Sequence, residues 1–238
     1  MIQVITFDLD NTLWDVEPVL LRAEQVQYEW LQIHRPAVTE RYSIEALREF
    51  RMKTWKAHPE LAHHISELRR RGLYELQRQC DYSEEESQRG AQAAFDAFLE
   101  VRHQVEPYEK ALEVLERLAE RYTIGALTNG NADVYKADIG ECFDFAFTAE
   151  QLGASKPLPD LFEASMAETG ARADQIVHVG DSPGHDVAGA QQLGIYTVWM
   201  NYPKDPWPGG DPADEEVHDL GELPAAIARI ESRQSTPS

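Results

Sequence analysis

The sequence predicts an α/β protein: a central parallel sheet with helices on both faces, into which a bundle of four helices is inserted. From residue 107 onward, short apolar runs alternate with amphipathic stretches, which is typical of parallel sheets. A similar apolar run opens the chain at residues 4–7, but residues 17–101 contain almost no strand signal. The first strand should therefore pair with strands that follow residue 107. Residues 1–15 and 105–238 are then one α/β core, and residues 16–104 are an insertion.

The insertion is predicted to be helical because its apolar residues recur at spacings of three and four. Pro36 is expected to end the first helix, and Gly72 to break the third. Ser83 and Glu86 have the spacing of a capping box, which predicts the start of the fourth. The helices are expected over residues 17–35, 44–55, 61–76 and 83–99. Four amphipathic helices with short connections predict a small bundle.

The core elements follow from the same patterns, and together they predict a Rossmann-like core. Strands are expected at residues 4–7, 123–127, 145–148, 176–179 and 195–200. Helices are expected at residues 111–119, 161–168, 187–193 and 223–230. Residues 201–216 are rich in Pro, Gly and Asp and predict a loop, and the tail from residue 233 is expected to be frayed.

Composition limits the possible partners. The chain has 238 residues, with 42 acidic and 22 basic side chains and a formal net charge of -20. Nucleic acid and anionic membranes are poor partners because both reward positive charge. Cys80 and Cys142 are distant in sequence and form no zinc or disulfide pattern. No basic-then-apolar leader and no apolar run of about 20 residues is present, so we expect a cytoplasmic protein, monomeric or weakly dimeric.

Polar side chains follow three of the predicted strands, at the edge where parallel α/β sheets bind ligands. The first strand is followed by Asp8 and Asp10, which start on the same side of an extended chain. The other residues expected at this edge are Thr128, Asn129, Lys156, Asp181, Ser182 and Asp186. Each has an ordinary structural explanation alone, since Asp favours turns and helix starts and a lone lysine is usually solvated. Their common placement favours a site.

These residue types suit phosphoryl transfer. Two neighbouring carboxylates repel each other unless a cation or a shared proton holds them. Magnesium prefers carboxylate and phosphate oxygens and reduces the repulsion between two anions. One carboxylate can attack phosphorus and form an aspartyl-phosphate, and another can protonate the leaving oxygen. A lysine and a hydroxyl can hold the charge on the transferring oxygens.

The motifs resemble those of the haloacid dehalogenase superfamily, in its usual order and with a helical cap after the first motif. They are Phe7-Asp8-Leu9-Asp10-Asn11-Thr12-Leu13, Thr128-Asn129-Gly130, Ser155-Lys156-Pro157 and Gly180-Asp181-Ser182 with Asp186. The resemblance implies that Asp8 is the nucleophile and Asp10 the general acid and base. It implies that Asp8, the Asp10 backbone carbonyl and Asp181 bind Mg2+. Ser182 and Asp186 would support these ligands without binding the metal, and Asp186 would order the metal's water shell or Lys156. Thr128, the Asn129 backbone and Lys156 would hold phosphate, and Lys156 would also steady the nucleophile.

Several alternatives remain. Dehalogenases of this superfamily generally lack a carboxylate two residues after the nucleophile, so Asp10 favours a phosphatase. A phosphomutase keeps both carboxylates and stays open, as does a binding protein without catalysis. An EF-hand loop beginning at Asp8 would need Gly at its sixth and Glu at its twelfth position. Those positions hold Leu13 and Val19, which excludes it.

A narrower resemblance concerns the substrate. The segments around Trp14, Asn131 and Val187 are similar to bacterial phosphatases of the riboflavin pathway. These act on 5-amino-6-(5-phosphoribitylamino)uracil and flavin mononucleotide, which makes a phosphorylated small molecule the expected partner. A generalist sugar-phosphate or nucleotide phosphatase is the alternative. Candidates for touching the leaving group are Trp14, Arg22, Trp55, Lys56, His58, His63 and His64.

Overall fold

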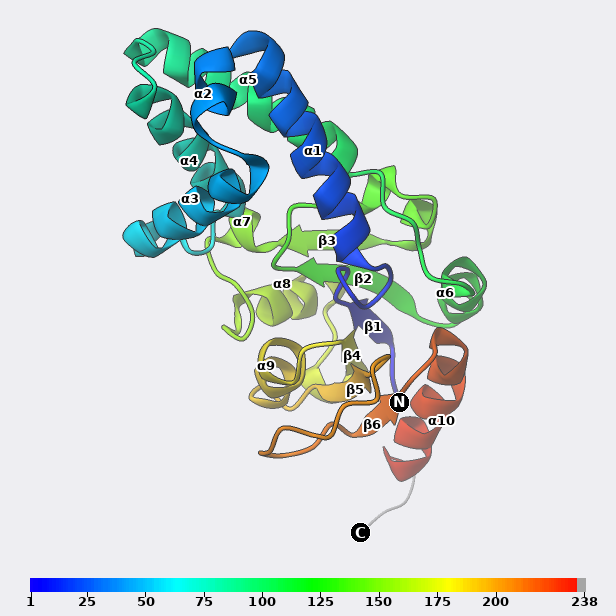
Figure 1. The fold of residues 1–238 in the computed structure, drawn as a ribbon. Coiled ribbons are helices and arrows are strands. Elements are labelled where there is room, and N and C mark those ends of the chain that lie inside the picture. Colours follow the sequence, from blue (N-terminus) through cyan, green and yellow to red (C-terminus); the bar gives the residue numbers. More distant parts are fainter. Residues whose placement is uncertain (235–238) are drawn as a thin grey trace. The chain divides into compact units, whose positions relative to one another are not determined.

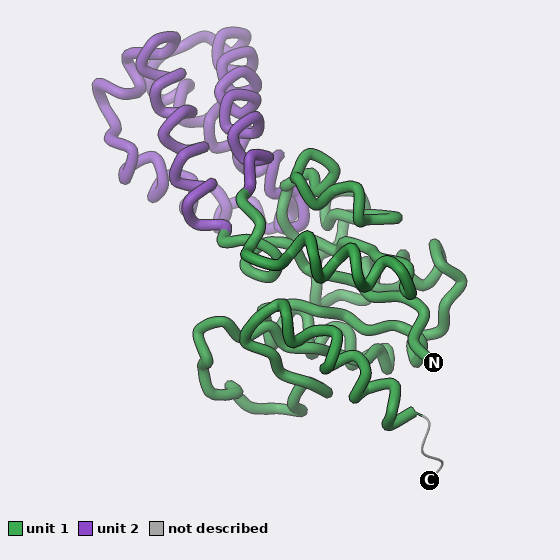
Figure 2. Tube along the Cα trace, turned by 90° about the vertical axis from the view of Figure 1, so that its right-hand side faces the viewer, with its two compact units in different colours: residues 1–15, 106–238 green, residues 16–105 purple. Residues whose placement is uncertain are grey.

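The computed structural model describes residues 1–234 of the chain. By its contacts the chain divides into two compact units, coloured separately in Figure 2. The first unit comprises residues 1–15 and 106–238, and the second comprises residues 16–105. The second unit is therefore an uninterrupted segment inserted into the first.

The first unit is built on a parallel sheet with strand order β3-β2-β1-β4-β5-β6 (Figure 1). The strands are β1 (Val4–Phe7), β2 (Thr123–Thr128), β3 (Phe145–Thr148), β4 (Ile176–Gly180), β5 (Tyr196–Met200) and β6 (Glu215–Val217). The prediction that the first strand pairs with later strands is confirmed, because β1 lies between β2 and β4. Phe7 is in register with Ala126 on one side and Val179 on the other. All four residues of β1 are buried, as expected of a central parallel strand.

Five α-helices accompany the sheet in the described part of this unit. They are α6 (Ala111–Ala119), α7 (Ala149–Leu152), α8 (Asp160–Thr169), α9 (Ala188–Gln191) and α10 (Leu223–Gln234). Figure 1 shows α8 and α9 on one side of the sheet and α6 and α10 on the other. Phe162 of α8 and Ala190 of α9 join Val4 and Leu127 in one buried cluster. The expected Rossmann-like α/β core, with helices on both faces, is thus confirmed.

The structure corrects three details of this unit. Strand β6 was predicted to be loop; it has three residues, two of them Glu, and therefore lacks an apolar strand pattern. It nevertheless pairs in parallel with β5. The helix expected from residue 187 begins earlier, as a turn of π-helix over Pro183–Val187. Helix α10 extends through Arg233, whose Nη1 lies 2.7 Å from Glu215 Oε1 of β6. The rest of the tail predicted to be frayed, residues 235–238, lies outside the described residues.

The second unit is entirely helical apart from its connections. Its helices are α1 (Val16–His34), α2 (Pro36–Arg41), α3 (Ile44–Ala57), α4 (Ile65–Gln79) and α5 (Glu84–Arg102). Leu31, Leu76, Phe95 and Phe98, all buried, belong to its apolar core. The predicted capping box at Ser83 is confirmed, since its backbone N–H donates to Glu86 Oε2 at 2.9 Å and its Oγ accepts from the Glu86 N–H at 3.3 Å.

Two details of the helical unit differ from prediction. Pro36 follows the end of α1 but also begins the short helix α2, because proline suits the first position of a helix. The third long helix begins at Ile65 rather than near residue 61 and continues through Gly72. A Cβ atom at Gly72 would lie 3.7 Å from Thr54 Oγ1, so this glycine packs closely against α3 without a break. No helix among residues 1–234 combines the length and apolarity needed to cross a membrane.

Candidate active site

One hollow at the carboxyl ends of β1, β2 and β4 gathers every predicted site residue. It has a volume of about 280 Å³. Its lining consists of Asp8, Asp10, Asn11, Thr128, Asn129, Gly130, Lys156, Asp181, Ser182, His185 and Asp186. We call this space the catalytic hollow. Residues up to 178 positions apart in the chain therefore meet where the parallel strands end, as the topology requires.

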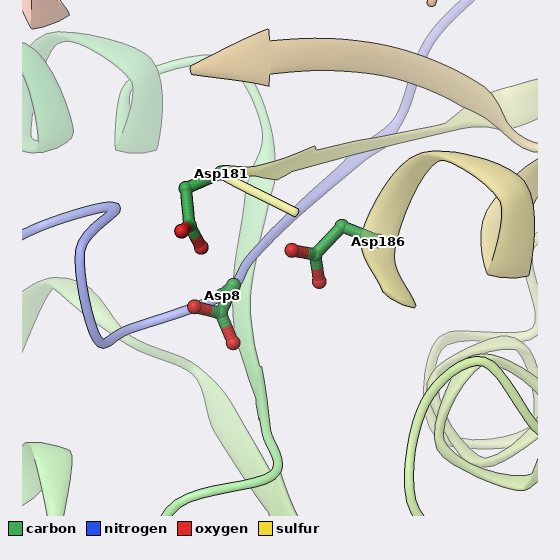
Figure 3. Close-up of side chains that lie close together, drawn as sticks. All are labelled: Asp8, Asp181 and Asp186. Atoms are coloured by element: carbon green, nitrogen blue, oxygen red, sulfur yellow. The ribbon is translucent and has the colours of Figure 1, made fainter. Parts of the chain in front are cut away.

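Three carboxyl groups converge in the catalytic hollow. One oxygen from each of Asp8, Asp181 and Asp186 can be chosen so that all lie within 4.8 Å of one another. Figure 3 shows Asp181 and Asp186 directed toward the space beside Asp8. Such a donor set fits a hard divalent cation. The Asp10 side chain is outside this group, so it fits a cation site only through its backbone carbonyl.

Lys156 is buried between two of these carboxylates. Its Nζ lies 2.7 Å from Asp8 Oδ1 and 2.7 Å from Asp186 Oδ1. The same ammonium donates to the Leu127 carbonyl at 2.6 Å. All three ammonium hydrogens therefore have an acceptor, and the side chain is only 1% exposed. Lys156 is not the solvated surface lysine that the sequence alone left possible.

Asn129 fixes the backbone that carries Lys156. The Lys156 N–H donates to Asn129 Oδ1 at 2.8 Å, and Asn129 Nδ2 donates to the Lys156 carbonyl at 3.0 Å. The amide side chain is thus used for positioning, which leaves phosphate binding by Asn129 to its backbone. Next to it, the buried Thr128 hydroxyl accepts a hydrogen bond from the Gly130 N–H at 2.9 Å.

Asp186 is held by partners from three directions. Besides Lys156, its Oδ1 lies 3.1 Å from His178 Nε2, and its Oδ2 accepts from the Ser182 N–H at 3.0 Å. Because both oxygens are engaged, Asp186 is better suited to orient Lys156 than to bind a cation directly. Gly180 makes this approach possible, since a Cβ atom there would lie 2.2 Å from the Asp186 carboxyl carbon.

His178 is a site residue that the sequence did not reveal as such. Its Nδ1 lies 2.9 Å from Thr6 Oγ1, while Nε2 faces Asp186. A carboxylate only accepts, so Nε2 carries the proton and Nδ1 accepts from the Thr6 hydroxyl. Burial lowers the pKa of His178, which favours this neutral form. The available signal was a histidine in the middle of an otherwise apolar central strand.

Asp10 is oriented by the turn that follows β1. Its Oδ1 accepts a hydrogen bond from Trp14 Nε1 at 2.8 Å. The Asn11 N–H donates to the Trp14 carbonyl at 2.7 Å, and Asn11 has the left-handed φ of 62° that closes this turn. Trp14 is 0% exposed. Trp14 was predicted to touch the leaving group, but this buried side chain supports Asp10 instead.

Negative charge dominates the electrostatics of the catalytic hollow. Burial raises the pKa of Asp8 to about 8, with Lys156 acting in the opposite direction. Burial, followed by the negative charge of Asp186, raises the pKa of Asp181 to about 6. For Asp186, burial acts upward but Lys156 and His178 outweigh it and lower the pKa. Three carboxylates around one ammonium leave an excess of negative charge, which a divalent cation would relieve.

A second hollow of about 490 Å³ adjoins the first and shares Asn11 and Asp181 with it. We call it the aromatic hollow because Tyr108, Trp199 and Tyr202 line it. The rings of Tyr108 and Tyr202 have centroids 4.4 Å apart. Trp199 Nε1 donates to the Asp181 carbonyl at 2.8 Å, which ties this wall to the catalytic hollow. This hollow was not predicted from the sequence, because Tyr108 and Tyr202 lie in connecting segments.

The remaining predicted contacts to a leaving group lie in the inserted helical unit, and their role stays a prediction. They are Arg22, Trp55, Lys56, His58, His63 and His64. His58 is held by Glu60 and Glu75, at 2.9 Å from Nδ1 and 3.1 Å from Nε2.

Comparisons with known proteins agree with this arrangement. A model of the haloacid dehalogenase-like hydrolase family matches residues 2–194. The chain is 32% identical over 199 residues to the 5-amino-6-(5-phospho-D-ribitylamino)uracil phosphatase YigB of Escherichia coli, covering 84% of this chain and 83% of that protein. It is 27% identical over 209 residues to a glyceraldehyde 3-phosphate phosphatase of Pyrococcus abyssi, covering 86% and 83%.

A crystal structure described as a 2-haloacid dehalogenase from Pseudomonas syringae pv. tomato superimposes with a TM-score of 0.90. The two chains are 39% identical, and the match covers 96% of this chain and 99% of the other. The resemblance of the motifs is therefore confirmed. The protein belongs to the haloacid dehalogenase-like hydrolases.

Proposed function

We propose that the protein is a Mg2+-dependent phosphomonoester hydrolase that works through an aspartyl-phosphate on Asp8. The observation that carries the proposal is the pairing of Asp8 with the buried Lys156 while Asp10 is anchored separately by Trp14. One carboxylate is thus held beside a positive charge for attack, and the other is held apart for proton transfer.

The proposed reaction has two steps. In the first, an Asp8 oxygen forms a bond to phosphorus, the ester P–O bond breaks, and Asp10 donates a proton to the leaving oxygen. In the second, Asp10 removes a proton from water, and that water displaces phosphate from Asp8. The Thr128 hydroxyl, the Asn129 backbone and Lys156 hold the phosphoryl oxygens in both steps.

The metal site is proposed to consist of Asp8, the Asp10 carbonyl and Asp181, whose carboxylates fit a hard cation. When bound, Mg2+ would supply positive charge that lowers repulsion between Asp8 and the phosphate. Ser182 and Asp186 are proposed to lie behind these ligands, and Asp186 to hold Lys156 in place.

A dehalogenase is the main rival, because a similar structure carries that description. Halide leaves a carbon centre as a stable anion and needs no proton, whereas an alkoxide does. An anchored acid at Asp10 therefore favours phosphate esters. The crowding of three carboxylates points the same way, since displacement of halide from carbon requires no divalent cation. A phosphomutase or a binding protein fits the same residues but has no additional observation in its favour.

For the substrate we propose 5-amino-6-(5-phosphoribitylamino)uracil or flavin mononucleotide. The relative in Escherichia coli bears the first of these in its name. The aromatic hollow next to Asp181 offers Tyr108 and Tyr202 to a ring on the leaving group. The helical unit is proposed to act as a cap that selects the substrate. A generalist sugar-phosphate phosphatase is the alternative, and a cytoplasmic, monomeric or weakly dimeric protein remains our prediction.

The decisive assay uses p-nitrophenyl phosphate with Mg2+, then with a chelator, and 2-chloropropionate in parallel. We expect hydrolysis of the phosphate ester that the chelator abolishes, and no release of chloride. Asp8→Asn should remove turnover while the circular dichroism spectrum stays unchanged. Chloride release without phosphatase activity would contradict the proposal and identify the protein as a dehalogenase. A screen that includes the ribityl-uracil phosphate and flavin mononucleotide then ranks the substrates.

A further inference from the structure

The helical unit contains a concentration of positive charge that the proposed reaction does not use. Glu24 of α1 receives three arginines, and we call these four residues the arginine cluster. Arg48 Nε lies 2.5 Å from Glu24 Oε2, and Arg51 Nη1 contacts Glu24 Oε1. Arg69 of α4 is more distant, with Nη2 at 3.9 Å from Oε1. Three guanidinium groups against one carboxylate leave a net positive charge in a chain whose formal net charge is -20.

Arg69 is the member of the arginine cluster that lacks a strong partner. Its side chain is 9% exposed, and its 3.9 Å separation from Glu24 is too long for a hydrogen bond. The guanidinium carbon lies 3.6 Å from the centroid of the Phe98 ring. A buried charged group without a hydrogen-bond acceptor is costly. At Arg51, the buried Nε has no hydrogen-bond acceptor among the described residues.

A cavity adjoins these groups. Its volume is about 40 Å³, and its polar wall consists of Glu24, Gln27, Arg48, Arg51 and Arg69. The rest of the lining is Gly72 and the apolar residues Ile44, Leu47, Phe50, Leu73 and Leu76. A water molecule needs roughly 10–15 Å³ on this measure, so the cavity holds about three waters or one small oxyanion. The planar donors of arginine match the oxygens of phosphate or sulfate, which can accept from two guanidinium groups at once.

We propose that the arginine cluster is a binding site for a small inorganic oxyanion, phosphate or sulfate, with Arg69 as its principal ligand. Such an anion would give Arg51 Nε the acceptor it lacks, could approach Arg69 more closely than Glu24 does, and would balance the excess positive charge. Burial and then the positive charge of Arg51 lower the pKa of Arg69 to about 9, as expected where positive charge is in excess. The site is separate from the catalytic hollow in sequence and unit, and it does not rest on the proposed reaction.

The test is thermal unfolding of the full chain in chelator, with sodium phosphate or sulfate titrated at constant ionic strength. We expect the unfolding temperature of the wild type to rise by about 5–10 °C at a hundredfold excess over the dissociation constant. Arg69→Met should lose this part of the response while retaining any contribution from the catalytic hollow. Arg71→Met is the matched control, since Arg71 lies on the same helix with a side chain 47% exposed, and it should respond fully.

A second variant changes the affinity in the opposite direction. Glu24→Gln removes the internal carboxylate that competes for the guanidinium groups, and we expect the dissociation constant for sulfate to fall by about tenfold. An unchanged response in Arg69→Met would overturn the proposal, and so would weaker sulfate binding by Glu24→Gln. A purely structural Arg69 would lower the unfolding temperature on substitution but leave the anion response intact.

Discussion

Replacement of Lys156 by methionine tests the electrostatic arrangement of the catalytic hollow. The change removes an ammonium that lies 2.7 Å from Asp8 Oδ1 and 2.7 Å from Asp186 Oδ1, with a side chain only 1% exposed. Two buried carboxylates then lose the positive charge between them, although Asp186 keeps its hydrogen bonds from His178 and the Ser182 N–H. Removing one partner of a buried ion pair costs about 3–5 kcal/mol. For a protein of this size the unfolding temperature should fall by about 6–20 °C.

The same substitution should also impair catalysis. Losing one group that stabilises the charge of the transferring phosphoryl oxygens lowers kcat by about 10²–10³. Urea unfolding measures the loss of stability, and steady-state hydrolysis of p-nitrophenyl phosphate measures the fall in kcat. Lys136→Met is the matched control, because Lys136 is exposed in the same unit and should change stability by no more than about 0.5 kcal/mol.

The stability effect has a pH dependence of known sign. Without Lys156 the two carboxylates raise each other's pKa, so they lower stability when ionised and cease to do so once one is protonated. Because the pKa of Asp8 is already raised to about 8 with Lys156 present, the stability lost by Lys156→Met should shrink as the pH falls through about 8, and added Mg2+ should restore part of it above pH 8. A variant as stable as the wild type at pH 8 without metal would refute the reasoning.

Four further outcomes follow from the site. His178→Phe leaves the buried Thr6 hydroxyl without its acceptor and removes one donor from Asp186, so it should lower the free energy of unfolding by about 1–3 kcal/mol, as measured in urea; no change would remove its positioning role. Trp14→Phe deletes the donor to Asp10 and should lower kcat by about fivefold with little effect on KM, whereas a change confined to KM would contradict this. Because the pKa of Asp8 is raised to about 8 and that of Asp181 to about 6, Mg2+ affinity by calorimetry should fall up to tenfold per pH unit below pH 8 and more steeply below pH 6, and a flat profile between pH 5 and 8 would count against both residues as ligands. Tyr202→Ala should raise KM for flavin mononucleotide more than for ribose 5-phosphate, and equal changes would exclude the aromatic hollow as a ring site.

The parallel core and the gathering of the site could be predicted because they follow from local patterns plus one topological rule. The apolar run of β1 has no possible partner in the helical segment, which places it beside β2 and β4. Once the strands are parallel, Asp8, Thr128 and Asp181 must share an edge. The short strand β6 could not be predicted, because Glu215 and Glu216 carry no apolar signal and their pairing depends on β5 being present.

Other parts of the site depend on contacts that spacing does not encode. Asn129 was expected near phosphate, but its side chain clamps the backbone of Lys156 from 27 positions away. His178 becomes a site residue only because β4 lies next to Thr6 of β1 and the turn to Asp186 folds back over it. Side-chain partners across strands and loops depend on the assembled fold, so they can be identified only once that fold is known.

The arginine cluster illustrates the same limit in the helical unit. The apolar stripes of α1, α3 and α4 predict which faces pack, but not that Glu24, Arg48 and Arg69 meet at their border. Even so, the exposed capping box at Ser83 follows the predicted spacing, and the core around Phe95 follows the predicted periodicity.

Identification of the covalent intermediate tests the central claim most directly. The wild-type protein is mixed with a phosphate ester and Mg2+, quenched in acid within one turnover, and digested for mass spectrometry. We expect phosphate attached to Asp8, and none in Asp8→Asn. Turnover with no phosphorylated carboxylate, or with phosphate on another residue, would contradict the nucleophilic role of Asp8.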